Sequence, residues 1–146
     1  MSQKRKVLIL CTGNSCRSIM AEALINHYLS DSWQAFSAGT HPSVVNPWAL
    51  RVLREAGVET ANLYSKGITE FLYMDDLNLV ITVCRHADAN CPVFPLPVKR
   101  LHIGIDDPVV YSAATAETAL AKFRESLQSI KELIVDRLAI ETDTDS

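Results

Sequence analysis

The stretch Cys11-Thr12-Gly13-Asn14-Ser15-Cys16-Arg17-Ser18 follows the apolar run Val7–Leu10 and precedes a helical pattern that begins near Ser18. A buried strand, a short loop and a helix in this order place the loop at the positive end of the helix. Successive backbone N–H groups of such a loop can surround a tetrahedral oxyanion. The pattern therefore predicts a strand–loop–helix unit in which Thr12, Gly13, Asn14, Ser15, Cys16 and Arg17 form an oxyanion site.

Cys11 is the candidate nucleophile at the start of this loop. The planar guanidinium of Arg17 can hold two oxygens of a bound anion at once, which a lysine cannot do. The same donors, together with the hydroxyl of Ser18, favour the thiolate form of Cys11, which is the reactive form. Gly13 can adopt a positive φ at the tight turn, and Asn14 tolerates the left-handed region. The alternative is a structural cysteine before an ordinary turn, but it does not explain why Arg17 and Ser18 stand at the end of the loop.

The composition indicates one compact domain spanning residues 1–146. A chain of 146 residues with 48% hydrophobic residues can bury a core without disulfides. A net charge of -3 argues against nucleic acid or an anionic membrane as the main partner. No apolar run approaches the roughly 18 residues of a membrane span, and the basic start does not form a signal peptide. Four cysteines in such a chain predict a cytoplasmic protein with reduced thiols.

Apolar periodicity predicts an alternation of strands and helices. Strands are expected over Val7–Leu10, Trp33–Ser37, Leu77–Val83 and Leu101–Ile105, and helices over Ile19–Leu29, Pro47–Ala56, Ser65–Met74 and Ala114–Leu138. The polar tail Glu141–Ser146 is expected to fray. This order predicts a single α/β domain with a four-stranded parallel sheet and helices on both faces. Ligands of such sheets bind beyond the carboxyl ends of the strands.

Asp107 follows the fourth expected strand and precedes Pro108. Proline restricts the residue before it to extended backbone, so the loop can aim a carboxyl group at the oxyanion site. A carboxylic acid there can protonate a leaving oxygen or accept a proton from an incoming one. Asp-Pro is also a common start of a turn, so this motif alone leaves both interpretations open. Asp106 is interpreted as a solvated turn residue.

Cys84 and Cys91 form a second group of thiols after the third expected strand. On a continuous helix, residues seven apart lie roughly 10.5 Å apart along the axis, whereas a disulfide needs Cα atoms about 4.4 to 6.8 Å apart. The pair can form a bond only if the intervening segment bends or unwinds, which Pro92 and the modest helix formers Asp88 and Asn90 favour. The alternative is a buried apolar Cys84 and an incidental surface thiol at Cys91.

Together these residues resemble the thioredoxin-coupled arsenate reductases, which share the low-molecular-weight protein tyrosine phosphatase fold. The resemblance rests on the loop, on Cys84 and Asn90-Cys91-Pro92, and on Asp106-Asp107-Pro108, and it extends to Met20-Ala21-Glu22, Ser37-Ala38-Gly39-Thr40 and Val45-Asn46-Pro47. A phosphatase needs one catalytic thiol, and phosphatases of this family usually carry paired tyrosines where this chain has Val109 and Val110. A low-molecular-weight tyrosine phosphatase is the alternative function.

The resemblance implies that the chain reduces arsenate to arsenite in arsenic detoxification, with weak phosphatase activity at the shared anion site. Cys11 would attack arsenic while Asp107 protonates a departing oxygen. Cys84 would then attack Cys11 and release arsenite, and Cys91 would attack Cys84. Thioredoxin would reduce the final disulfide, although the sequence does not distinguish it from glutaredoxin or glutathione. Cys16 has no step in this scheme.

Members of the resembled family often bind a monovalent cation beneath the loop, at positions that correspond to Asn14, Glu22 and Ser37 and an acid near position 66. This chain has Lys66 there. Its ammonium can take the place of the cation, or its side chain can point to solvent, so dependence on potassium is doubtful. The spacings Cys-x4-Cys and Cys-x6-Cys do not match the usual metal-ligand sets, and we expect no cofactor.

Overall fold

The computed structural model describes residues 4–91 and 98–144. The elements in chain order are β1 (Arg5–Cys11), α1 (Arg17–Tyr28), β2 (Trp33–Gly39), α2 (Pro47–Glu55), the 3-10 turn η1 (Ile68–Phe71), β3 (Leu79–Thr82), α3 (Arg85–Ala89), β4 (Lys99–His102), the 3-10 turn η2 (Pro108–Tyr111), α4 (Ala116–Ile130), the π-helical turn η3 (Lys131–Val135) and α5 (Asp136–Thr144). The strands form a parallel sheet in the order β2-β1-β3-β4, which confirms the predicted sheet.

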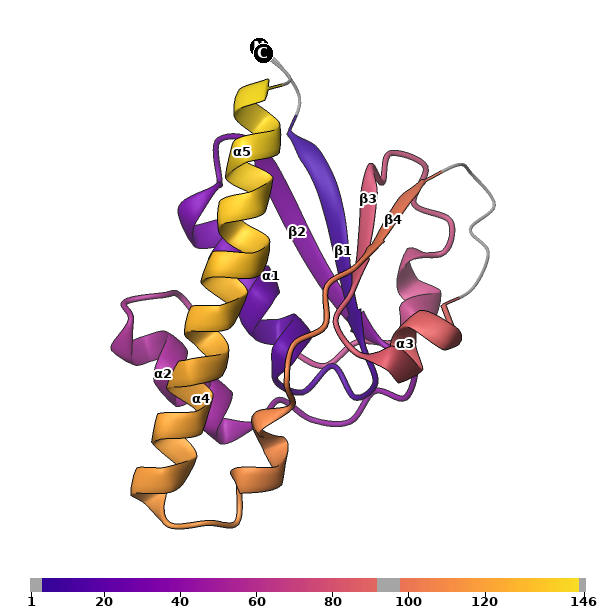
Figure 1. The fold of residues 1–146 in the computed structure, drawn as a ribbon. Coiled ribbons are helices and arrows are strands. Elements are labelled where there is room, and N and C mark those ends of the chain that lie inside the picture. The colour runs from indigo at the N-terminus through magenta and orange to yellow at the C-terminus, as the bar shows by residue number, and fades with distance from the viewer. Residues whose placement is uncertain (1–3, 92–97, 145–146) are drawn as a thin grey trace.

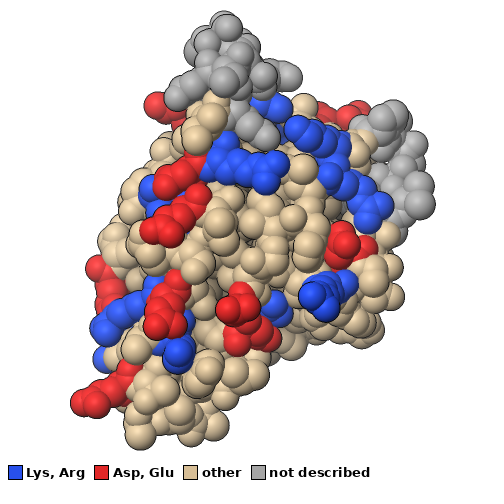
Figure 2. All heavy atoms as spheres, in the orientation of Figure 1, with Lys and Arg blue, Asp and Glu red and all other residues tan. Residues whose placement is uncertain are grey.

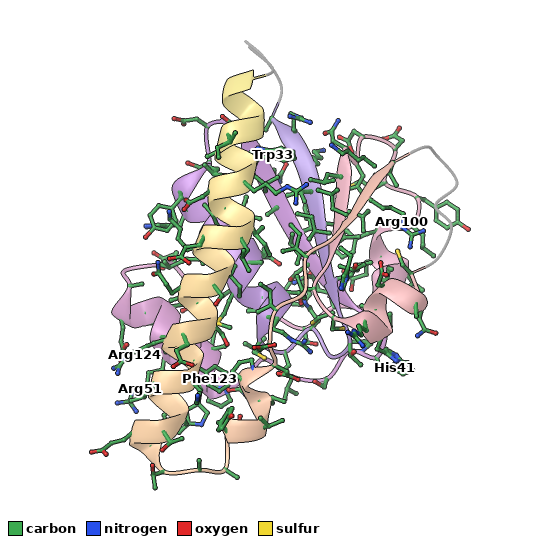
Figure 3. The ribbon with its side chains drawn as sticks, in the orientation of Figure 1. Trp33, His41, Arg51, Arg100, Phe123 and Arg124 are labelled. Carbon is green, nitrogen blue, oxygen red and sulfur yellow. The ribbon has the colours of Figure 1, made fainter. Side chains whose placement is uncertain are left out.

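Helices cover both faces of the sheet, as Figure 1 shows. The helices α1, α2, α4 and α5 pack on one face over the larger apolar cluster, and Phe123 of α4 lies in this layer (Figure 3). The opposite face carries the short helix α3 and the turn η1 over a smaller cluster that includes Leu8, Leu10 and Phe71. No helix in the described parts of the chain is long and apolar enough to span a membrane.

β1 lies inside the sheet, and its side chains pack into both apolar clusters. Val7 and Ile9 belong to the larger cluster and Leu8 and Leu10 to the smaller one, which is the alternation expected of a strand buried on both faces. Its last residue, Cys11, pairs in register with Gly39 of β2. The register therefore brings the ends of the two strands together beneath the loop that follows Cys11.

Several predicted elements differ from the structure, and the third strand is shorter than expected, Leu79–Thr82 rather than Leu77–Val83. The helix expected over Ser65–Met74 is reduced to η1, because residues before it run extended and pair with the end of β2: Gly39 N–H donates to the carbonyl of Lys66 at 2.8 Å. The fourth strand is Lys99–His102 rather than Leu101–Ile105. β4 lies at the sheet edge and most of its side chains are exposed. The apolar pattern of the sequence therefore does not predict where this strand begins and ends.

The C-terminal helix also differs from the prediction. It begins at Ala116 because Thr115 caps it, accepting a hydrogen bond from Thr118 N–H at 3.2 Å. It contains the π-helical turn η3, which the sequence did not reveal. It continues to Thr144, into the tail that was expected to fray, and residues 145 and 146 lie outside the described residues. Adding residues to an existing helix costs little, which accounts for the extension.

Candidate active site

The sulfur of Cys11 is buried and surrounded by hydrogen-bond donors. Ser18 Oγ lies 2.8 Å from Cys11 Sγ, and Asn14 N–H donates to the same sulfur at 3.2 Å. The side-chain amide of Asn14 donates to Ser18 Oγ at 2.8 Å, which leaves the Ser18 proton free to point at the sulfur. Donors directed at sulfur stabilise a thiolate. The structure therefore places the predicted residues Asn14 and Ser18 in direct contact with the predicted nucleophile.

The loop is held in shape by neighbouring segments that lie far away in the sequence. Of the two residues expected to permit a positive φ, Asn14 adopts it, with a φ of 47°, and Gly13 does not. The amide of Asn14 can tie that conformation to its surroundings, which explains why a non-glycine residue is tolerated there. Gly13 lies close to Ser43, since a Cβ at this position would lie 3.2 Å from Ser43 Oγ. The carbonyl of Gly13 accepts a hydrogen bond from Ser65 Oγ at 3.0 Å.

Gly39 supports the loop from the end of β2. A Cβ at this position would lie 2.5 Å from the carbonyl oxygen of Thr12 and 2.8 Å from the backbone nitrogen of Asn14. Both contacts are shorter than real side chains show and both are to backbone, which cannot rotate away. Gly39 therefore permits the close approach of the loop. The sequence did not reveal this contact, because the need for a glycine here depends on the register of β1 and β2.

Arg17 and Asp107 meet beside the loop. Arg17 Nη2 lies 3.2 Å from Asp107 Oδ2, and Arg17 Nη1 donates to the carbonyl of Ile105 at 3.0 Å. The Nε of Arg17 is buried and has no partner among the described residues. A buried charged donor without an acceptor is costly, so this atom is suited to an oxyanion in the loop. The contact between Arg17 and Asp107 places the predicted acid at the edge of the predicted oxyanion site.

Cys16 is a protonated thiol rather than a second nucleophile. It is 4% exposed, and its Sγ donates to Asp107 Oδ1 at 3.7 Å. Burial, and secondarily the negative charge of Asp107, raises the pKa of Cys16 from 9.0 to about 12. At neutral pH this thiol is therefore a donor that helps to orient Asp107.

Cys84 lies next to the nucleophile's loop. Its Sγ is 3.4 Å from Thr12 Oγ1, and Thr12 directly follows Cys11. Cys84 also caps α3, accepting a hydrogen bond from Ala87 N–H at 3.4 Å. A hollow of about 430 Å³ is lined by Cys84, Arg17, Asp107 and their neighbours. Three residues predicted from separate parts of the sequence therefore face one space at the carboxyl end of the sheet.

Cys91 lies beyond the end of α3, and all four cysteines are unbonded in this structure. Both Cys84 and Cys91 pack against the smaller apolar cluster, so the two thiols share one side of the sheet. Burial raises the pKa of Cys91, the charge of Asp88 raises it further, and Arg100 lowers it. The helix stops at Ala89, short of Cys91, in keeping with the weak helix formers there. Pro92 lies outside the described residues.

Lys66 is buried beneath the loop with its charge paired. Its side chain is 5% exposed, and its Nζ lies 3.3 Å from Glu22 Oε1 and donates to the carbonyl of Tyr64 at 2.7 Å. Ser37 Oγ donates to the same Glu22 oxygen. The backbone N–H of Lys66 donates to Asn14 Oδ1 at 2.7 Å. The four residues predicted as a support site thus form one connected group, in which Glu22 Oε1 receives both the Lys66 ammonium and the Ser37 hydroxyl.

Another hollow in the described structure lies elsewhere. It measures about 780 Å³ and is lined by Lys4, Lys6 and Trp33 at the end of the sheet where β1 begins. Figure 2 shows Lys and Arg side chains gathered along this upper end of the face in view. This hollow lies at the opposite end of the strands from Cys11, so it is not part of the oxyanion site. In the described residues no group of three or more potential ligands could hold a metal ion.

A family model for "Low molecular weight phosphotyrosine protein phosphatase" matches residues 6–142, which include the whole site. The chain belongs to this family. Within the family it is similar to an arsenate reductase from Bacillus cereus strain 03BB102, with 38% identity over 133 residues that cover 91% of this chain and 98% of the relative.

Solved structures of this phosphatase family agree with that placement. One is described as an arsenate reductase in the phosphate binding state; it has a TM-score of 0.74 at 27% identity and covers 94% of this chain and 98% of its own. Another is a thioredoxin-dependent arsenate reductase from Corynebacterium glutamicum, with a TM-score of 0.57 at 28% identity, covering 90% of this chain and 64% of its own. The predicted family membership and phosphatase-like fold are therefore confirmed.

Proposed function

We propose that this member of the family is an arsenate reductase that converts arsenate to arsenite by a relay of three cysteines. The observation that carries this proposal is the position of Cys84, whose Sγ lies beside Thr12 at the edge of the oxyanion loop. A phosphatase has no use for a second thiol at that place. The relatives named arsenate reductase and the thioredoxin-dependent neighbour support the same assignment.

The first step is attack by the Cys11 thiolate on arsenic. The oxyanion is held by the loop N–H groups and by Arg17, whose buried Nε is free to donate to it. An As–S bond forms and an As–O bond breaks, and Asp107 supplies the proton that lets the oxygen leave as water. Its contacts with Arg17 and Cys16 direct the carboxyl group toward the loop.

The second and third steps move the oxidation from arsenic to the cysteines. Cys84 attacks Cys11 Sγ, the As–S bond breaks, and arsenic takes up the two electrons of that bond and leaves as arsenite. Cys91 then attacks Cys84 Sγ and frees Cys11, so that one disulfide remains between Cys84 and Cys91. A dithiol protein, for which we propose thioredoxin, reduces this disulfide and completes the cycle. Such a cycle is suited to the cytosol, where protein thiols stay reduced.

The direct test is arsenate-dependent oxidation of NADPH in the presence of thioredoxin and thioredoxin reductase. Cys11→Ser is expected to abolish turnover, because serine keeps the loop but is not a thiolate nucleophile. Arg17→Lys is expected to reduce activity severely, since the bidentate contact is lost while the charge remains. Substantial arsenate turnover by Cys11→Ser would remove Cys11 from the central role.

The two later thiols are separated by single-turnover experiments. Cys84→Ser is expected to stop before arsenite release yet to keep any weak hydrolysis of a phosphate ester, which needs Cys11, Arg17, Asp107 and water. Cys91→Ser is expected to release one arsenite per enzyme and to stop with a Cys11–Cys84 disulfide, which peptide mapping by mass spectrometry identifies. Normal turnover by both variants would contradict the relay and favour a phosphatase, or a reductase that uses an external thiol such as glutathione.

A further inference from the structure

Thr82, the last residue of β3, is a buried polar residue that joins three elements. It is 1% exposed, and its Oγ1 donates to Asp88 Oδ1 of α3 at 3.0 Å. The same Oγ1 lies 2.9 Å from Nδ1 of His102, at the end of β4. A hydroxyl has one proton, and here it points at the carboxylate, so His102 Nδ1 must be the donor of the second bond. We call this chain of hydrogen bonds, from His102 through Thr82 to Asp88, the Thr82 bridge.

The Thr82 bridge holds α3 in its helical form at a point between the two thiols. Asp88 lies four residues after Cys84 and three before Cys91. Its backbone takes part in both turns of α3, because Asp88 N–H donates to the carbonyl of Cys84 at 3.1 Å and Cys91 N–H lies 3.5 Å from the carbonyl of Asp88. The side chain of Asp88 thus fixes to the sheet the segment that separates Cys84 from Cys91.

This segment must change shape when the two thiols bond. The residues Arg85–Ala89 between them are helical; on a continuous helix residues seven apart are separated by roughly 10 Å, whereas a disulfide requires Cα atoms within about 7 Å. Shortening the segment displaces Asp88 from β3. The buried hydroxyl of Thr82 then loses a charged acceptor, and a hydrogen bond to a charged group is worth more than a neutral one. The Thr82 bridge is therefore compatible with the dithiol form and is strained or broken in the disulfide form.

We propose that Thr82, Asp88 and His102 are positioning residues that stabilise the dithiol form of the Cys84–Cys91 pair and thereby raise its reduction potential. The proposal rests on the proposed function, since it takes these two thiols as the redox pair. Stabilising the reduced form of a dithiol makes its disulfide a stronger oxidant. The consequence for the cycle is that the final disulfide passes readily to a dithiol partner and the resting enzyme stays reduced until arsenate arrives.

The test is the equilibrium of the pair with dithiothreitol, measured in a Cys11→Ser background so that Cys84 cannot pair with Cys11. In this exchange Cys84 and Cys91 lose two electrons and two protons, which convert one oxidised dithiothreitol to its dithiol. Samples are alkylated, and peptide mapping gives the fraction of the Cys84–Cys91 disulfide. Thr82→Val keeps the shape of the side chain and removes both hydrogen bonds. We expect it to increase the equilibrium constant for disulfide formation about tenfold, which lowers the potential by about 30 mV.

Three further variants separate the Thr82 bridge from general stability. Thr82→Ser keeps the hydroxyl and is expected to retain the parent potential. His102→Ala removes one end of the bridge and is expected to lower the potential by less than Thr82→Val does. Val52→Ala truncates a buried side chain of α2 on the opposite face, so it lowers stability with no change in potential. Asp88→Asn is less informative, because Asp88 also raises the pKa of Cys91.

Different results would contradict the role of the Thr82 bridge and the cysteine relay. An unchanged or raised potential in Thr82→Val, or an equal shift in Val52→Ala, would overturn the role of the Thr82 bridge and leave the relay intact. Failure of the Cys11→Ser parent to form any Cys84–Cys91 disulfide under oxidising dithiothreitol would contradict the relay itself, and this proposal with it.

Discussion

Lys66 links the support of the loop to the nucleophile through a short series of contacts. Its ammonium is paired with Glu22, its backbone N–H binds Asn14, and Asn14 in turn binds Ser18 and Cys11. Because this ammonium is buried and already neutralises Glu22, we propose that it takes the structural place of a monovalent cation beneath the loop. The positive charge that stabilises the loop is then a side chain of the protein and not a dissolved ion.

This proposal predicts an enzyme that is indifferent to potassium. Arsenate turnover is expected to be equal in potassium chloride and in choline chloride at matched ionic strength. Lys66→Met leaves Glu22 without its counter-charge, and breaking a largely buried pair in this way should lower the free energy of unfolding by about 3 kcal/mol. Urea unfolding measures that loss. The double variant Glu22→Gln/Lys66→Met should lose less, and a wild-type enzyme that requires potassium would refute the proposal.

Among the secondary-structure elements, the sequence predicted well those whose signals are local. The β1–loop–α1 unit and α2 were predicted because turns and apolar runs act over a few residues; the structure shows that Asn46 caps α2 and that a proline occupies its first turn. The sequence predicted a longer helix where the structure has the short turn η1, because pairing of Lys66 with the end of β2 outweighed helix propensity. The same distinction holds for the site, since the contiguous loop was foreseen, whereas the contacts of Gly39 and Cys84 depend on strand register.

The π-helical turn η3 has a packing reason that the sequence pattern concealed. Ile130 and Leu138 are both buried, and in an unbroken α-helix residues eight apart differ by about 80° around the axis. One extra residue in a wide turn removes about 100° of rotation and leaves the two side chains within about 20° of each other. The turn therefore lets α4 and α5 pack on the same core while they form one continuous helix.

Deletion of a single exposed residue tests this account of η3. Removing Leu133, which is 48% exposed, should convert η3 to ordinary α-helix while Leu138 stays on the core face. We expect the unfolding free energy to change by less than about 1 kcal/mol, as for surface changes that leave the core intact. Removing exposed Glu125 within α4 is the matched control; it should rotate the buried residues after it out of register and cost several kcal/mol. Equal losses in urea unfolding would contradict the packing argument.

The whole molecule separates the Cys84–Cys91 pair from most of its core. The larger apolar cluster joins α1, α2, α4 and α5 to one face of the sheet, and the smaller cluster lies under α3 on the other face. Cys91 packs against the smaller cluster alone, and Cys84 lies where the two meet. A change of shape in α3 therefore disturbs few of the apolar contacts that hold the domain together, and most of the stability is independent of the redox state.

This division predicts where the protein responds to oxidation. Hydrogen exchange should show a folded, fully reduced protein, and formation of the Cys84–Cys91 disulfide should change protection at α3 and its neighbours far more than at α1, α2 or α4. The reason is that backbone hydrogen bonds of α3 must open to shorten the distance between the thiols, while those helices stay packed on the larger cluster. The double variant Cys11→Ser/Cys91→Ser treated with the same oxidant is the control; it removes both proposed partners of Cys84 and should show no change at α3. A uniform change across the sheet on oxidation would mean that the two faces are coupled and that the relay draws on the stability of the entire domain.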